Sequence, residues 1–127
     1  MKRLCLLLAV LLLLSGCGQG GDAQSYVQIS QEQAQEMMSR EDGHIVVDVR
    51  RQDEYDAGHI PGAVLIPNES ITDTPPEALP ELEQVILIYC RSGNRSKQAA
   101  QKLASMGYTN IYEFGGITTW TGDVVTE

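Results

Sequence analysis

Two short runs of consecutive apolar residues place the strongest constraint on the fold of this chain. Ile45-Val46-Val47 and Val85-Ile86-Leu87-Ile88-Tyr89 are continuous rather than alternating, which predicts strands buried on both faces of a sheet. After residue 25, apolar runs alternate with amphipathic segments, an order typical of βαβ units with helices covering a parallel sheet. The sequence therefore predicts an α/β fold, with candidate strands at 26–29, 45–49, 63–66, 85–89 and 110–113.

The segments between these strands carry helix signals. Ser30 followed by Gln33 forms a capping box, which marks the start of a helix. Gly58 and Gly107 each follow an amphipathic segment, and glycine is the residue that most often ends a helix. The expected helices are 30–39, 51–57 and 96–106.

Length and charge limit the class of protein. A chain of 127 residues with 43% hydrophobic residues can bury the core of one domain without disulfides or a structural metal. Its formal net charge of −8 argues against nucleic-acid binding, which needs clustered basic residues. Residues 67–80 are rich in Pro, Asp, Thr and Glu, and we expect them to be a long surface connection inside one domain spanning 26–127.

The N-terminal segment has the pattern of an export signal. Lys2 and Arg3 precede an apolar run over residues 4–14, which is too short for a helix of about 20 residues that would cross a bilayer. The following Leu14-Ser15-Gly16-Cys17 resembles the lipobox of bacterial lipoproteins, in which cleavage precedes a lipid-linked cysteine. The alternative is an ordinary secretory signal that happens to contain a cysteine.

These features predict three segments and a location. Residues 1–16 would be a lipoprotein signal peptide, and Cys17 would be the fatty-acylated N-terminus. The small polar residues up to 25 would form a flexible tether to the domain. We therefore expect a lipid-anchored protein of the bacterial cell envelope, on the exported side of the membrane.

The cysteine count then singles out one thiol. Cys5 would leave with the signal and Cys17 would carry lipid, so Cys90 would be the one thiol of the mature protein, with no intrachain disulfide. A lone thiol in an oxidising compartment is exposed to oxidation and mispairing, which marks Cys90 as a candidate reactive group. The alternative is a buried and inert cysteine.

Cys90 ends a predicted strand and begins a loop that runs into a helix. Free backbone N–H groups and the helix dipole make such a loop an anion site, which stabilises a thiolate. Arg91, Arg95 and Lys97 add positive charge to this loop. Lys2 and Arg3 would leave with the signal peptide, so these three make up a large share of the basic residues that the mature chain would keep. The sequence thus predicts a reactive thiolate beside a docking place for a small anion.

Loop length separates two chemistries for such a thiolate, attack on a phosphoryl group or attack on a sulfane sulfur. Cysteine phosphatases use a Cys-x5-Arg loop whose arginine clamps a tetrahedral oxyanion. Here Arg95 gives Cys-x4-Arg. The smaller ring of N–H groups favours one terminal sulfur on Cys90 over phosphate or arsenate.

With this loop, three further motifs make the chain resemble a single-domain rhodanese over about residues 26–122. They are Asp48-Val49-Arg50, Glu54-Tyr55-Asp56-Ala57-Gly58-His59-Ile60-Pro61-Gly62-Ala63 and Gly115-Gly116-Ile117-Thr118-Thr119-Trp120. The resemblance implies a five-stranded parallel sheet with helices on both faces. It also implies a sulfurtransferase that moves sulfane sulfur from a donor such as thiosulfate to cyanide or a thiol, through a persulfide on Cys90.

The resemblance also assigns the loop residues. Arg91 and Arg95 match positions that would steer and hold an anionic donor, and the persulfide would lie among the backbone N–H groups of Ser92, Gly93, Asn94, Arg95 and Ser96. Ping-pong kinetics should follow, because one sulfur rests on the protein between two half-reactions. An alternative hypothesis is a membrane-tethered persulfide carrier or redox-sensing module with little free thiosulfate turnover.

The remaining polar residues of these motifs are expected to be structural. Asp48, Arg50 and Glu54 should form one hydrogen-bonded and charged network at the end of a central strand, and His59 should order the backbone of its turn. The histidines and cysteines show no metal-ligand spacing, so we expect no metal and no cofactor. Besides the small anionic donor, the thiol or cyanide acceptor and the membrane, no partner is predicted, and we expect a monomer.

Overall fold

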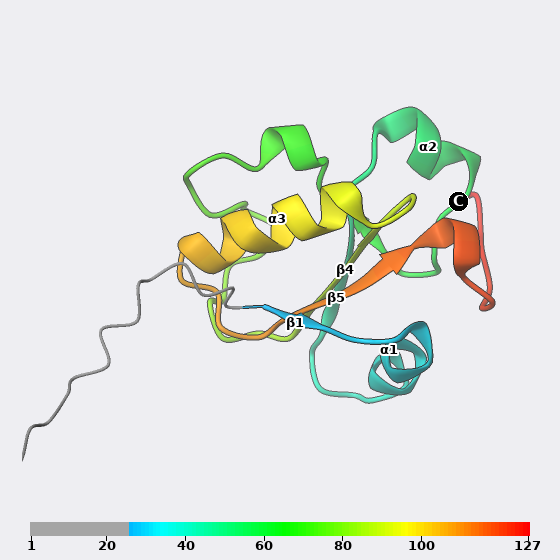
Figure 1. Cartoon of the computed structure of the whole chain (residues 1–127), viewed down its shortest axis with the longest axis horizontal. Helices are drawn as coiled ribbons and strands as arrows, with labels where there is room; N and C mark the ends of the chain where they lie inside the picture. Colours follow the sequence, from blue (N-terminus) through cyan, green and yellow to red (C-terminus); the bar gives the residue numbers. More distant parts are fainter. Residues whose placement is uncertain (1–25) are drawn as a thin grey trace, which may run out of the picture.

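The computed structural model describes residues 26–127 (Figure 1). The predicted signal peptide 1–16, Cys17 and the tether to residue 25 lie outside the described residues. The elements in chain order are β1 (Val27–Gln28), α1 (Gln31–Met38), β2 (Ile45–Asp48), α2 (Gln52–Ala57), β3 (Val64–Leu65), the 3₁₀ helix η1 (Asn68–Ser70), β4 (Ile86–Cys90), α3 (Asn94–Ser105), β5 (Ile111–Gly116) and the 3₁₀ helix η2 (Ile117–Thr119).

The strands form one five-stranded sheet in the order β1-β5-β4-β2-β3, and every strand pair is parallel. Helices α1 and α3 lie on opposite faces of this sheet (Figure 1). The α/β fold class and the covering of both faces are therefore confirmed. The carboxyl ends of β2 and β4 meet at one edge, where ligands bind in open parallel sheets.

Each face of the sheet has its own apolar core. On one face, Ala99, Ala100 and Leu103 of α3 pack on Ile86 and Ile88 of β4. The other core joins buried Ala34 of α1 to Leu87, Tyr89 and Phe114. Because successive residues of a strand point to opposite faces, the continuous run in β4 supplies both cores.

Three predicted segments differ in detail from the structure, and one of them is the last strand, β5, which continues to Gly116 instead of ending at residue 113. Helix α3 begins at Asn94, two residues before its expected start, because Gly93 adopts a left-handed conformation and turns the chain directly into the helix. Residues 67–80 are not purely a surface connection, since Ile71 and Leu79 are buried in the core between α3 and the sheet. Apolar side chains thus anchor both halves of this segment to the domain.

No helix within residues 26–127 is long and apolar enough to cross a membrane.

Strand β5 carries an irregularity that fixes the loop after β4. Ile88 pairs with Glu113 but Cys90 pairs with Gly116, so β5 uses one residue more than β4 over this stretch. A Cβ on Gly116 would collide with the backbone of Arg91 and Ser92. The φ of Gly116 is −135°, which any residue adopts, so the requirement for glycine here is steric.

Gly116→Ala should therefore destabilise the domain by about 1–3 kcal/mol, because the loop after Cys90 must move to admit a methyl group. Urea denaturation measures this loss. Glu77→Ala, at an exposed loop position, is the comparator and should change the stability little. A Gly116→Ala protein as stable as the wild type would contradict the close contact between β5 and the loop.

Candidate active site

Cys90 lies at the carboxyl end of central strand β4 and is 1% exposed. The backbone N–H of Gly93 donates a hydrogen bond to its Sγ at 2.9 Å. This contact depends on the φ of +110° at Gly93, a left-handed conformation that L side chains rarely adopt. The loop thus folds back so that a backbone dipole points at the sulfur.

The N-terminus of α3 adds further donors beside this sulfur. The first intrahelical bond runs from Lys97 N–H to the Gly93 carbonyl, at 3.3 Å. The N–H groups of Asn94, Arg95 and Ser96 precede that bond and belong to the free first turn of the helix. An anion on Cys90 is therefore favoured by the loop backbone and by the helix dipole together.

The loop is tied to the segment after β5. The Arg91 carbonyl accepts hydrogen bonds from Thr118 N–H at 3.2 Å and from Thr118 Oγ1 at 3.1 Å. Gly116 packs against the same stretch of backbone. The peptide groups around Cys90 are thus held in place before any substrate binds, so little reorganisation is needed when charge develops there.

Arg95 is committed to an ion pair rather than left free in the loop. Its Nη1 and Nη2 donate to the two carboxylate oxygens of Glu54 at 2.7 and 3.0 Å. These hydrogen bonds lower the pKa of Glu54 from 4.5 to about 2, and the same bonds raise the pKa of Arg95. Arg91 and Lys97 are exposed, so they are the loop cations available to a solution anion.

A second charged pair lies deeper, at the end of β2. The Asp48 carboxylate accepts four hydrogen bonds from Arg50, whose Nη2 lies 2.7 Å from Oδ2, and a fifth from the Tyr89 hydroxyl at 2.6 Å. Burial and the contact with Asp48 raise the pKa of Tyr89. The Arg50 side chain also donates to the Gly58 carbonyl at 2.7 Å. This pair joins β2 to β4 and to the end of α2.

The expected single network of Asp48, Arg50 and Glu54 is divided in the structure. Asp48 and Arg50 bind each other, whereas Glu54 binds Arg95 and the Arg51 N–H, the latter at 3.0 Å. The reason is that Glu54 occupies the first turn of α2 and faces the cysteine loop, while Asp48 lies on the buried strand. The two pairs thus serve different elements.

His59 contacts the backbone of its own turn. Its Nδ1 lies 2.9 Å from the Tyr55 carbonyl, its ring stacks on the Tyr55 ring at 3.7 Å, and its main chain pairs with Val125. These contacts agree with a role in ordering the turn. Among residues 26–127, no group of three or more His, Cys, Asp or Glu side chains is placed to hold a metal ion.

Glu113, which lies near Cys90, was not identified as a site residue from the sequence. Glu113 of β5 is 2% exposed, and its Oε2 accepts a hydrogen bond from Ser96 Oγ at 2.6 Å. Ser96 Oγ in turn lies 3.4 Å from Cys90 Sγ. The signal was present, because Glu113 stands two residues after Ile111 and must share its buried face in a strand.

This arrangement defines a class of protein: a parallel α/β domain whose central strand delivers a cysteine into a short anion-binding loop at a helix N-terminus. Residues 30–123 match the family model of the Rhodanese-like domain. The chain therefore belongs to the rhodanese family.

Named relatives share most of the domain. The chain is 38% identical over 96 residues to thiosulfate sulfurtransferase GlpE of Pseudomonas entomophila, covering 75% of this chain and 84% of that protein. It is 34% identical over 71 residues to thiosulfate sulfurtransferase PspE of Escherichia coli, covering 56% of this chain and 68% of that one.

Solved structures agree with the fold. A rhodanese with anions from E. coli superposes with a TM-score of 0.61 at 30% identity, covering 66% of this chain and 99% of that chain. A rhodanese-related protein from Thermoplasma volcanium gives a TM-score of 0.68 at 27% identity, covering 80% of this chain and 100% of that chain.

The pair between Glu54 and Arg95 predicts a pH-dependent contribution to stability. Because the pKa of Glu54 is lowered in the folded state to about 2, its contribution should be complete above about pH 4.5 and should disappear as the pH falls through 2. Glu54→Gln should cost on the order of 1–2 kcal/mol at pH 7, after allowance for solvent screening. Denaturant titrations at pH 7 and pH 3 measure the difference.

Glu77→Gln, at an exposed carboxylate, serves as the charge-matched control and should show little change between the two pH values. A Glu54→Gln deficit of the same size at pH 7 and pH 3 would contradict the ion pair as its source.

Proposed function

We propose that this protein is a sulfurtransferase that moves sulfane sulfur from thiosulfate, or a similar anionic donor, to a thiophilic acceptor through a persulfide on Cys90. The chain is an enzyme of the rhodanese type, as its family and its named relatives indicate. The observation that carries the proposal is the hydrogen bond from Gly93 N–H to Cys90 Sγ at 2.9 Å, in a loop that opens α3.

The first half-reaction follows from this placement. The Cys90 thiolate uses a lone pair to form a bond to the sulfane sulfur of thiosulfate. The bond between that sulfur and the sulfonate sulfur breaks, and sulfite leaves with the electron pair. Charge is conserved, because the thiolate becomes a persulfide anion and the thiosulfate dianion becomes a sulfite dianion. The terminal sulfur then lies among the N–H groups of Gly93 to Ser96.

The second half-reaction returns Cys90 to its starting state. Cyanide or an acceptor thiolate attacks the terminal sulfur, and the electron pair of the sulfur–sulfur bond returns to Cys90. Arg91 and Lys97 are exposed beside the loop, so they attract both anionic donors and anionic acceptors.

The phosphatase alternative fits the site less well. A phosphatase needs an arginine that is free to clamp the equatorial oxygens of a phosphoryl group. Both terminal nitrogens of Arg95 are already bound to Glu54, and the loop is one residue shorter than the phosphatase loop. A single sulfur atom needs only the backbone donors.

A persulfide carrier with slow free turnover remains the second candidate. The observation in its favour is the burial of Cys90, which is 1% exposed and hidden from bulk solvent. A carrier would pass its sulfur to a docked partner rather than to small molecules in solution.

Treatment of the full chain with thiosulfate, followed by gel filtration and cyanide, tests the transfer. We expect one equivalent of cyanide-labile sulfur per chain and none in Cys90→Ser, which removes the nucleophile and preserves side-chain size. Rapid steady-state formation of thiocyanate would favour the enzyme over the carrier. Absence of labile sulfur in the wild type, alongside a sulfurtransferase control that acquires it, would overturn the proposal.

The location of the protein is part of the proposal and rests on sequence alone. The apolar run at 4–14 and the lipobox ending at Cys17 support a lipid anchor on the exported side of the bacterial membrane. Cys17→Ser should move the protein from the membrane fraction to the soluble fraction of fractionated cells and should abolish labelling by a fatty-acid probe. Unchanged membrane association and unchanged labelling would contradict the anchor.

A further inference from the structure

Glu113 is a buried carboxyl group that the sulfur-transfer steps leave unused. It is 2% exposed, and its Oε2 accepts hydrogen bonds from Gly115 N–H at 2.9 Å and Ser96 Oγ at 2.6 Å. Its Oε1 receives only a long contact of 3.5 Å from the Gln28 side chain. Among the ion pairs of residues 26–127, none involves Glu113.

The irregular pairing of β5 places this group beside the site. Glu113 pairs with Ile88, which faces α3, and the extra residue that follows turns Gly115 N–H back towards the carboxylate. The φ of Gly115 is +91°, a conformation suited to glycine. Glu113 therefore points at the first turn of α3, on the same face of the sheet as Cys90.

Ser96 connects Glu113 to the sulfur. Its Oγ lies 2.6 Å from Glu113 Oε2 and 3.4 Å from Cys90 Sγ, with the Gly93 carbonyl as a further acceptor at 3.0 Å. A hydroxyl has one proton to donate, and the shortest contact has the length of a bond to a charged acceptor. When Glu113 is ionised, the proton of Ser96 points to it, and only an oxygen lone pair is left to face Cys90.

That orientation suits a thiol and opposes a thiolate. Two buried anions joined by one hydroxyl would also repel each other, so the pair shares a single proton more readily than it loses both. A negative charge on Cys90 has the Gly93 N–H and the N-terminus of α3 beside it, and a negative charge on Glu113 has the Gly115 N–H. Within residues 26–127, no cationic side chain forms an ion pair with Glu113.

The other ionisable groups around the pair are already committed or distant. On α3, Arg95 is bound to Glu54 of α2, Lys102 is bound to Asn68, and Lys97 is exposed. On β4, Tyr89 faces the opposite core and binds Asp48. Arg91 is exposed in the loop, and β1 contributes only uncharged Val27 and Gln28, next to Tyr26 in the core.

We propose that Glu113 accepts the proton of Cys90 through the Ser96 hydroxyl and keeps it while the sulfur is anionic. In this step the Cys90 S–H bond breaks, and its proton binds Ser96 Oγ. The former Ser96 hydroxyl proton passes to Glu113 Oε2, so one negative charge moves from the carboxylate to the sulfur. The Ser96 hydroxyl then points at Cys90 and donates to the thiolate or persulfide anion. Glu113 is thus a positioning residue, acting through Ser96.

This inference deepens the proposed function by naming where the proton of the nucleophile goes, and it rests on that function for its purpose. Its test uses no sulfur donor, so the two can fail separately. The thiolate absorbance of Cys90 is titrated in the ultraviolet, as the difference between each protein and its Cys90→Ser counterpart. The proteins compared are the wild-type chain, Glu113→Gln and Glu77→Gln.

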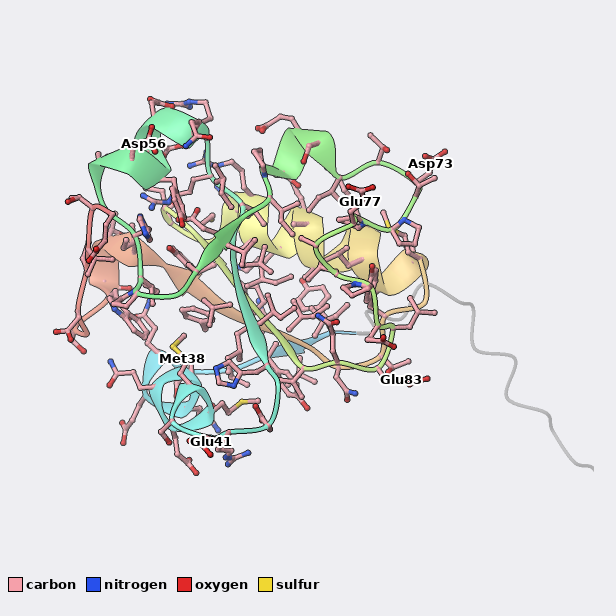
Figure 2. All side chains as sticks on the ribbon, turned by 180° about the vertical axis from the view of Figure 1, so that it is seen from behind. Met38, Glu41, Asp56, Asp73, Glu77 and Glu83 are labelled. Carbon is pink, nitrogen blue, oxygen red and sulfur yellow. The ribbon has the colours of Figure 1, made fainter. Side chains whose placement is uncertain are left out.

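If Glu113 holds the proton of Cys90, the wild-type thiolate forms beside a neutral carboxyl group, and the later ionisation of Glu113 adds no thiolate. Glu113→Gln cannot ionise, and its amide donates to Ser96 as a protonated carboxyl would. Its thiolate should therefore appear over the same pH range as the wild-type thiolate. Glu77 is exposed on the loop between η1 and β4 (Figure 2), and Glu77→Gln should follow the wild type. A Glu113→Gln thiolate that appears at clearly lower pH than the wild-type thiolate would overturn the proposal, because the wild-type carboxylate would then keep its charge beside the sulfur.

A second measurement does not depend on how Glu113→Gln folds. At a neutral pH where Cys90 is a thiolate, infrared spectra should contain a protonated-carboxyl C=O band that shifts on isotope labelling of glutamate side chains. The band should be absent from Cys90→Ser, in which position 90 carries no charge and Glu113 is free to ionise. Absence of the band from the wild type, or the same band in Cys90→Ser, would contradict proton transfer to Glu113.

Discussion

The contact between the loop after Cys90 and the irregular end of β5 is the constraint on which the site depends. Gly116 leaves no room for a side chain against the backbone of Arg91, and Thr118 binds the Arg91 carbonyl twice. Together they fix the loop from one side, while Gly93 turns it into α3 on the other. The sulfur of Cys90 lies between these two supports, so its hydrogen-bond donors are set by the fold and not by the ligand.

The charged side chains act at different distances from this sulfur. Asp48 and Arg50 neutralise each other in the interior and connect the two central strands to α2. Glu54 of α2 binds Arg95 in the first turn of α3. Neither guanidinium is free to take a substrate oxyanion in the way a phosphatase arginine does. The anion at the site is therefore supported mainly by backbone N–H groups, with Arg91 and Lys97 left at the surface to attract charged reactants.

Most of the fold and the central residue of the site could be predicted from the sequence, because both follow local patterns. The continuous run before Cys90 marks the central strand, and the polar loop with a glycine marks the helix start. The division of Asp48, Arg50 and Glu54 into two pairs could not be predicted, since it depends on how α2 is turned towards the loop. For Glu113, the strand pattern marks the residue as buried, but its direction towards Ser96 depends on the extra residue in β5, which the two adjacent glycines alone do not reveal.

The most direct test of the account is a high-resolution crystal structure of the thiosulfate-treated protein, supported by the intact mass of the same sample. We expect one extra sulfur atom bonded to Cys90 Sγ, within hydrogen-bonding distance of the backbone N–H groups between Gly93 and Ser96, and a mass gain of one sulfur. An unmodified Cys90, or a terminal sulfur that points away from those N–H groups, would contradict the claim that this loop is built to hold a persulfide.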